Sequence, residues 1–466
     1  MKQTIKKMIS CITAIACVGA GIVLPNVQEI LPEMSVVAMA DDMTYGDLKY
    51  QIFDDVDGTK GIIITHCSNE VSLVEIPLEI DGILVTNIGD FAFQDCINLT
   101  NITIPDGVMY IEDYAFRRCT GLINVEIPNS VISIGDSAFC NCENLVNISL
   151  PNSITTIKDC AFEGCDSLTN ITIPDSIKVI NRSVFEGCDS LTDIYIPDNV
   201  TIIGERAFHG CKGLTDIIIP DSIVSIGIGA FSKTPFLENQ TTDIKYVGKW
   251  VVTCNEEAAD VEIATGTIGI AKNAFAGNIN LVNITIPDSV MYIDDFAFLC
   301  CENLIDIKIS NNVKNIGFGA FSGCISLKNI TIPDSVTNIE SCSFSFCTNL
   351  KSVTISNSVT NIEEAAFKYC ENLTDVYYKG TEEQWNQINI DNGNECLNNA
   401  KIHFNYKDAT GDINGDGDFT VSDVVSVQKW LLGSEEITDW KAGDFDRNDK
   451  LNIFDICIMK HKLLNK

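Results

Sequence analysis

Apolar and polar residues alternate along this chain in a unit that returns every 23 residues. In residues 168–190, LTNITIPDSIKVINRSVFEGCDS, the apolar positions Leu168, Ile171 and Ile173 are spaced near the strand period of two. Pro174 has no N–H to donate to a backbone ladder, so it predicts the end of this strand. No part of the unit is long enough for a stable helix. Each unit therefore predicts one coil of a mainly β solenoid, with a rise of about 4.8 Å per coil.

Two residue types mark the repeat most clearly. Cysteine keeps the step of 23 at Cys96, Cys119, Cys142, Cys165, Cys188, Cys211, Cys301, Cys324, Cys347 and Cys370. Phenylalanine keeps it at Phe93, Phe116, Phe139, Phe162, Phe185, Phe208, Phe231, Phe275, Phe298, Phe321, Phe344 and Phe367. A fixed period over so many units is typical of repeat proteins that stack into a solenoid.

The cysteine column has two interpretations. A cysteine stacked between coils behaves as a small apolar residue. Neighbouring coils would also bring thiols within disulfide distance. Because bridges would pair the coils two by two and nothing in the units alternates, we expect a buried and mostly reduced column.

The consensus LxxIxIPxxVxxIGxxAFxxC resembles the BspA-like class of leucine-rich repeats over roughly residues 70–400. Its last part, Val376 to Phe404, is similar to the closing cap of such arrays. We expect an N-terminal cap and first coil at 41–95, regular repeats at 96–375, and a C-terminal cap with a short linker at 376–407. Irregular ends are expected because they must cover an exposed core face.

The repeat is interrupted once, at 232–274, where 44 residues instead of 23 separate Phe231 from Phe275. The stretch YVGKWVV predicts a hairpin that turns at Gly248 and Lys249. An irregular coil that keeps the solenoid continuous is the main interpretation. The alternative is a binding protrusion built on Tyr246 and Trp250.

Residues on either side of each inward isoleucine should point outward from the sheet. The first outward column is Asn101, Asn124, Asn147, Asn170, Asp193, Asp216, Asn283, Asp306, Asn329, Ser352 and Asp375. The second is Thr103, Glu126, Ser149, Thr172, Tyr195, Ile218, Thr285, Lys308, Thr331, Thr354 and Tyr377. Tyr195 and Tyr377 are too far apart for one continuous glycan groove, since such grooves need aromatic platforms. Either the wall recognises a protein or it only satisfies hydrogen bonds between coils.

Composition narrows the classes of partner. The formal net charge of -33 repels nucleic acid and anionic lipid, so neither nucleic-acid binding nor membrane insertion is expected. Four scattered histidines give little material for a histidine metal site or a catalytic triad. Residues 1–40 carry a basic start, an apolar run and a small-x-small site before Asp41, which predicts a signal peptide and a secreted protein.

Near the C-terminus, DINGDGDFTVSD places oxygen-bearing side chains at the spacing of a calcium loop. The predicted ligands are Asp412, Asn414, Asp416, Asp418 and Asp423. The loop returns 32 residues later as DFDRNDKLNIFD, with Asp444, Asp446, Asn448, Lys450 through its carbonyl, and Asp455. A helix with an apolar side is expected after each loop, carrying Val424, Val427, Leu431 and Leu432 in the first case and Ile456, Met459, Leu463 and Leu464 in the second.

Two loop-helix halves that both close on aspartate resemble a type I dockerin, covering residues 408–466. The resemblance implies a module folded around two structural Ca²⁺ ions that binds a cohesin of a scaffoldin in cellulosomes of anaerobic bacteria. It also implies which residues contact the cohesin, namely Val421, Ser422, Gln428, Lys429, Ile453, Phe454, Lys460 and His461.

Two functions compete at this point. The first is a non-catalytic component whose dockerin anchors it to a cell-surface complex while the repeats bind a protein or a surface ligand. The second is an accessory or enzymatic role in plant polysaccharide breakdown. Signal peptide, solenoid, caps and dockerin account for almost the whole chain, and the interruption at 232–274 is too short for a hydrolase domain. The sequence therefore favours a protein that is not an enzyme.

Overall fold

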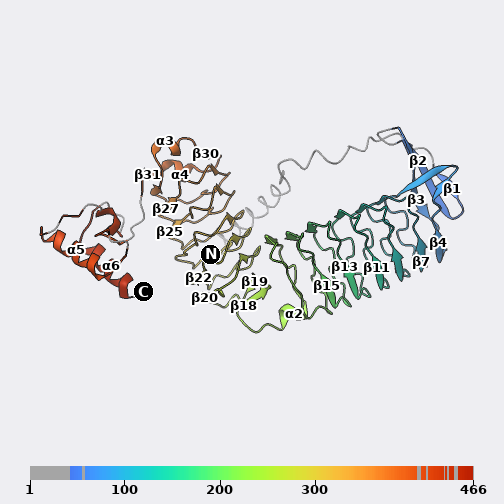
Figure 1. Cartoon of the computed structure of the whole chain (residues 1–466), viewed down its shortest axis with the longest axis horizontal. Coiled ribbons are helices and arrows are strands. Elements are labelled where there is room, and N and C mark those ends of the chain that lie inside the picture. The colour runs from blue at the N-terminus through green and yellow to red at the C-terminus, as the bar shows by residue number, and fades with distance from the viewer. Residues whose placement is uncertain are drawn as a thin grey trace, which may run out of the picture.

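The computed structural model describes residues 42–54, 58–406, 411–415, 418–434, 436–437, 440–445 and 450–464. Residues 42–54 and 58–406 form the predicted mainly β solenoid, and a small helical module follows it (Figure 1). The fold class expected from the repeat is thus confirmed. The predicted signal peptide at 1–40 lies outside the described residues.

An antiparallel cap covers the N-terminal end of the solenoid. Strand β2 pairs with β1 on one side and with β3 on the other, and β3 then pairs in parallel with β6. These strands and two short neighbours are β1 Met43–Tyr45, β2 Leu48–Asp54, β3 Lys60–Cys67, β4 Leu73–Glu75, β5 Glu79–Ile80 and β6 Ile83–Ile88. The change from antiparallel to parallel pairing marks where regular coils begin.

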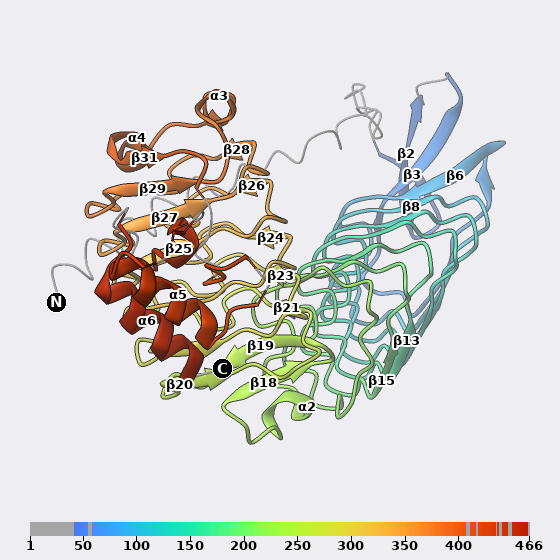
Figure 2. The same ribbon diagram turned by 60° about the vertical axis from the view of Figure 1, so that its left-hand side comes forward.

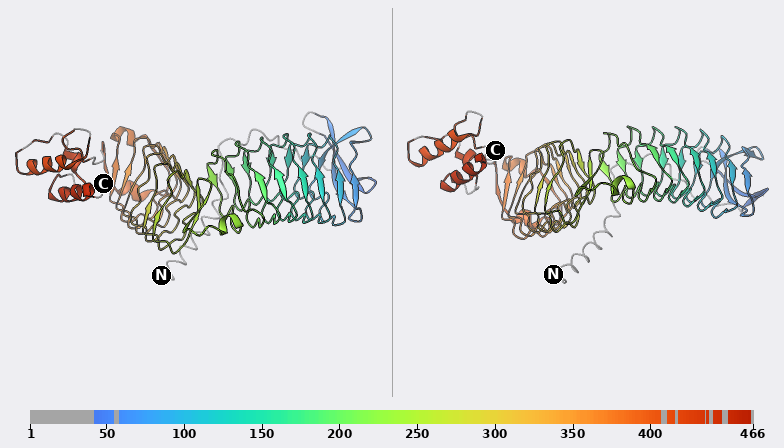
Figure 3. Two further views of the ribbon diagram at one scale, coloured as in Figure 1. Left: turned by 60° about the horizontal axis from the view of Figure 1, so that its bottom comes forward. Right: turned by 90° about the horizontal axis from the view of Figure 1, so that it is seen from below.

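Most regular coils contribute short strands to two parallel columns, which run along the solenoid in Figures 1 and 3 and are divided into several short sheets. The first column is β7 Asn101–Thr103, β9 Asn124–Glu126, β11 Asn147–Ser149, β13 Asn170–Thr172, β15 Asp193–Tyr195, β20 Asp260–Glu262, β22 Asn283–Thr285, β25 Asn329–Thr331, β27 Ser352–Ile355 and β29 Asp375–Tyr378. The second is β8 Tyr110–Ile111, β10 Ser133–Ile134, β12 Thr156–Ile157, β14 Val179–Ile180, β16 Ile202–Ile203, β17 Ser225–Ile226, β21 Gly269–Ile270, β23 Tyr292–Ile293, β24 Asn315–Ile316, β26 Asn338–Ile339 and β28 Asn361–Ile362. Equivalent residues stand side by side, as with Val125 and Ile148.

The phenylalanine column forms the spine of the core. The rings of Phe93 and Phe116 stack with centroids 4.9 Å apart and planes 12° from parallel, and the same arrangement continues to Phe231. A second stack runs from Phe275 to Phe367. One aromatic side chain per coil therefore fills the space between coils.

The cysteine column is buried, as expected, and its thiols also form hydrogen bonds that the sequence did not predict. Nine thiols, from Cys119 to Cys370, each donate to the carbonyl oxygen of the phenylalanine 26 residues earlier, at Sγ–O distances of 3.0 to 3.3 Å. All cysteines in the described part of the chain are free thiols. The thiol thus satisfies a carbonyl inside the core as well as filling space.

The interruption at 232–274 contains the expected hairpin. Strands β18 Ile244–Val247 and β19 Trp250–Cys254 pair antiparallel around Gly248 and Lys249, and the short helix α2 Pro235–Glu238 precedes them. Strand β19 then pairs in parallel with β21, so the solenoid continues. In Figure 2 the solenoid bends here into a first arm, β1 to β17, and a second arm, β20 to β31.

The alternative of a binding protrusion at this hairpin is wrong. Trp250 is completely buried, and its ring stacks on Tyr292 with centroids 6.0 Å apart. A side chain at Gly269 would meet the Trp250 ring at 2.4 Å, so only glycine fits at this close approach. Tyr246 is half-buried, and its hydroxyl accepts the N–H of Ala264 at 3.0 Å. Both aromatic residues therefore hold the bend together.

The last coil is built from short elements that extend both strand columns. Strand β30 pairs with β28, and β31 pairs with β29. The elements are α3 Glu382–Trp385, β30 Asn389–Ile390, α4 Glu395–Asn399 and β31 Lys401–His403. Beyond them lie α5 Val421–Leu431, the 3₁₀ helix η1 Trp440–Gly443 and α6 Ile453–Leu464.

Candidate functional site

The first predicted calcium loop is tied to the start of α5 by Asp423. Its Oδ2 accepts the N–H of Thr420 at 2.7 Å, while the Thr420 hydroxyl accepts from Ser422, which caps the helix. Its Oδ1 accepts the N–H groups of Ile413, at 2.9 Å, and Asn414. The carboxylate that closes the loop is completely buried. Asp423 therefore holds the beginning and the end of the loop together.

The second loop repeats this arrangement at α6. Asp455 is completely buried, and its Oδ2 accepts the N–H of Asn452 at 2.9 Å. The Asn452 side-chain oxygen accepts the N–H of Phe454 at 2.8 Å, as a cap of the helix start. Asp444, at the start of the loop, is also buried.

The donor chemistry of both loops fits calcium. Burying a carboxylate is costly unless it is hydrogen-bonded, paired or bound to a metal, and both loops bury their closing aspartate. Asp412, Asn414 and Asp418 are the further ligands predicted for the first loop, as Lys450 is, through its carbonyl, for the second. Within the described ranges, no three acidic, histidine or cysteine side chains form a group that could hold an ion. The predicted ligands Asp416, Asp446 and Asn448 lie outside these ranges, so both ligand sets stay predictions.

Helices α5 and α6 pack together around a small apolar core. Val424, Val427, Ile456 and Met459 are buried in it, as the apolar pattern of the sequence predicted. Three other residues expected on that side depart from the pattern: Leu431, Leu432 and Leu464 are exposed by 42%, 82% and 84%. They lie at or beyond the last turn of each helix, where the partner helix no longer covers them.

The residues expected to contact a partner protein lie at equivalent places on the two helices. Val421 is 68% exposed at the start of α5, and Ile453 and Phe454 are 58% and 69% exposed at the start of α6. Ser422 is exposed, and its hydroxyl accepts from the Asn414 side chain at 2.9 Å. The remaining four are further along the helices: Gln428 is half-buried, and Lys429, Lys460 and His461 are exposed. Their contact with a partner stays a prediction.

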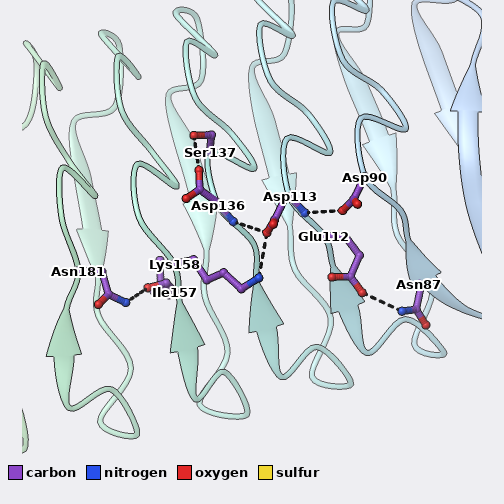
Figure 4. Close-up of polar contacts among 9 residues, drawn as sticks. All are labelled: Asn87, Asp90, Glu112, Asp113, Asp136, Ser137, Ile157, Lys158 and Asn181. Atoms are coloured by element: carbon purple, nitrogen blue, oxygen red, sulfur yellow. Dashed lines mark hydrogen bonds and ion pairs between the residues drawn. The ribbon is translucent and has the colours of Figure 1, made fainter. Parts of the chain in front are cut away.

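The solenoid carries a carboxylate column that sequence analysis missed, although its step of 23 is visible in the sequence. Asp90 accepts the N–H of Asp113 at 3.1 Å, and Asp113 accepts the N–H of Asp136 at 2.7 Å and the Lys158 ammonium at 3.0 Å (Figure 4). Burial, together with neighbouring Asp113, raises the pKa of Asp90, and burial raises the pKa of Glu112. Asp90 and Asp113 thus accept backbone N–H groups of the next coil, and Glu112 accepts from the Asn87 side chain at 3.0 Å, which is a structural role.

Both parts of the chain match known protein families. Residues 67–192, 178–298 and 268–396 match the BspA type leucine rich repeat region, which accounts for most of the chain. The chain belongs to the BspA-type leucine-rich repeat proteins. Residues 410–464 match the dockerin type I domain. A search of curated proteins found no match.

Several solved bacterial structures are similar to the solenoid. A leucine rich cell surface protein from Faecalibacterium prausnitzii is 32% identical over 76% of this chain and 98% of its own, with a TM-score of 0.41. A leucine-rich repeat protein from Bacteroides ovatus is 26% identical over 78% and 99%, with a TM-score of 0.37. One from Eubacterium ventriosum is 21% identical over 73% and 86%, with a TM-score of 0.34.

The two modules define the kind of protein. A dockerin implies binding to a cohesin in a cellulosome-type assembly, and leucine-rich repeats imply protein interaction. Both are non-catalytic types of module, and dockerins of type I are known to bind calcium. None of the helices in the described residues is long and apolar enough to cross a membrane.

Proposed function

We propose that this protein is a secreted, non-catalytic component of a cellulosome-type complex. Its dockerin, at residues 408–466, binds a cohesin of a scaffoldin in a calcium-dependent way, and its solenoid binds a protein or a ligand on a cell surface. The observation that carries the proposal is the pair of buried aspartates, Asp423 and Asp455, each closing a loop in front of an exposed helix start.

Calcium couples folding of the module to binding. The apolar core of the dockerin contains only a few buried side chains, which is little for an independent fold. Two Ca²⁺ ions held by the loops would supply the missing stability, because the ligands come together only in the folded state. The helix starts that carry Val421 and Phe454 would then be presented to the cohesin.

A binding experiment tests the proposal. The mature protein is passed over an immobilised panel of type I cohesins in calcium and in excess chelator. We expect retention by at least one cohesin in calcium and release in chelator. Asp423→Ala should reduce retention, whereas Glu436→Ala, an exposed acidic residue of the same module, should not. Equal retention with and without calcium would contradict the proposal.

The non-catalytic assignment has its own test. The mature protein is incubated with cellulose, xylan, mannan and pectin, and the release of reducing sugar is measured. We expect none above a heat-treated control. Reproducible release by the protein would favour the enzymatic alternative.

A further inference from the structure

A cavity of about 540 Å³ lies over the face formed by β25, β27 and β29, at the end of the solenoid next to the dockerin. Its volume falls in the range of about 300 to 1,000 Å³ that is usual for small-molecule sites. The solenoid side of the cavity is mainly polar, and Phe445 of the dockerin adds an aromatic ring. Figure 1 shows the dockerin beside this end of the solenoid.

Two opposite charges in the cavity are left without a partner. Asp306 and Lys351 both line it and are exposed. Within the described residues, neither side chain takes part in an ion pair or a hydrogen bond. Two other lysines of the second arm are paired: Lys272 with Asp295 at 2.7 Å and Lys379 with Asp334 at 3.1 Å. The cavity therefore offers a free carboxylate and a free ammonium group.

Neutral polar groups stand beside these charges. The side-chain oxygen of Asn329 accepts the Ser352 hydroxyl at 2.8 Å, and its NH₂ group has no acceptor among the described residues. The Thr331 hydroxyl likewise has no hydrogen-bond partner among the described residues. Asp375, in contrast, is engaged by Thr374 and by His403, each at 2.8 Å. Donors and an acceptor thus remain available from consecutive coils.

This combination selects a class of ligand. An anion would meet Asp306 and Asp375, and a cation would meet Lys351, so a neutral ligand is favoured. An apolar molecule would leave these polar groups unpaired and desolvated, which costs free energy. A sugar carries many hydroxyls that both donate and accept, and it has an apolar C–H face that an aromatic ring can cover. Phe445 supplies such a ring.

We propose that this cavity binds a neutral sugar unit, through Asp306, Asn329 and Lys351 with Phe445 against the sugar ring. This inference rests on the proposed function, because it names the class of surface ligand that the solenoid binds. A single pocket of this size takes a chain end or a side branch of a glycan. It is therefore compatible with the lack of a continuous row of aromatic residues along the solenoid.

The test uses the mature full-length protein in calcium, titrated with soluble cello-, xylo-, manno- and galacto-oligosaccharides in a calorimeter. We expect saturable binding of at least one class. Asp306→Ala and Asn329→Ala should each weaken it by about tenfold or more, as expected for loss of a hydrogen bond to a charged or buried group. Asn170→Ala, at the same repeat position in the first arm and also exposed, should leave binding unchanged.

Two results would overturn the inference: no saturable binding across the whole panel, or an equal loss in Asn170→Ala. Cohesin retention is measured on the same samples, together with circular dichroism to check folding. If sugar binding is absent while cohesin retention is intact, only the proposal for the cavity is contradicted. If cohesin retention is absent while sugar binding is intact, only the proposal for the dockerin is contradicted. The two proposals can thus fail separately.

Discussion

The thiol of Cys142 donates a hydrogen bond to the carbonyl oxygen of Phe116, 3.1 Å away, and both side chains are completely buried. The cysteine thereby links one coil to the spine of the preceding one. Because nine coils repeat this contact, the column adds a polar bond per coil to an otherwise apolar interior.

Removing one of these thiols should destabilise the solenoid. Cys142→Ala loses the bond to Phe116 and leaves a small cavity, so we expect the free energy of unfolding to fall by about 1 to 3 kcal/mol. Urea unfolding followed by circular dichroism measures the change. Cys457→Ala, at the exposed position on α6, is the control and should stay within about 0.5 kcal/mol of the parent. Equal effects of the two substitutions would argue against a structural bond.

The same burial should protect the column from alkylation. Burial raises the pKa of the Cys142, Cys165 and Cys188 thiols well above the usual range, so little thiolate exists at pH 8. In the native protein we expect iodoacetamide to modify Cys457 and to spare these three, as read by peptide mass spectrometry. After denaturation without reductant all of them should react. Residues that stay unmodified then would indicate disulfides instead of free thiols.

Asp294 predicts a pH dependence at the bend of the solenoid. It is buried in the second arm and accepts the Ser225 hydroxyl of the first arm at 2.5 Å, with Lys272 and Asp295 as its charged neighbours. Burial raises its pKa to about 6. The folded state thus holds the proton more tightly than the unfolded state. The stability from this group is fully present below about pH 4 and is lost as the pH rises to 6.

Urea unfolding from pH 4 to 7.5 measures this effect, whose size is about 2 to 3 kcal/mol for such a shift. Asp294→Asn should lack this part of the pH dependence. Asp198→Asn, an exposed aspartate of the first arm, should keep it. If Asp294→Asn and the parent protein lose stability in parallel over this range, the buried carboxyl is not the cause.

The dockerin should lose calcium when its first closing carboxylate is removed. Asp423→Ala deletes the acceptor for Ile413, Asn414 and Thr420 together with the predicted ligand, so we expect calcium affinity to fall by about tenfold or more. Calcium titration followed by the fluorescence of Trp430, which packs against the dockerin core, gives the affinity. Glu436→Ala should titrate like the parent. An unchanged affinity in Asp423→Ala would exclude this residue as a ligand.

The solenoid could be predicted from the sequence, because a position that is buried in every coil keeps the same residue type at every repeat. The step of 23 at phenylalanine and cysteine gave the coil length, and the aspartate spacing located both loops of the dockerin. The hairpin at Gly248 was equally visible as a local turn. These features depend on residues that are close in sequence or that repeat without change.

Other features required the three-dimensional structure. Tyr114, Ser137, Cys160 and Ser183 occupy the same repeat position with φ between 52° and 60°, a left-handed backbone that their residue types do not predict. Their N–H groups donate to carbonyls of the next coil, at 2.7 to 2.9 Å, and this contact holds the unusual conformation. Only the stacking of coils reveals it.

The burial of residues near the C-terminal end of the two outward columns could not be predicted from the repeat pattern. Ser352 and Thr354 were expected to point into solvent, yet they are 7% and 0% exposed. Tyr377 is paired with Thr354 in the neighbouring coil, and its ring packs against His403 and Tyr406. Most regular units have a smaller polar residue at the position of Tyr377. The sequence by itself determined the repeating coil and the paired loops, since both follow from local spacing. The tertiary structure decided the bend at Trp250, the thiol bonds and the free polar groups of the cavity, because each depends on which coils come into contact.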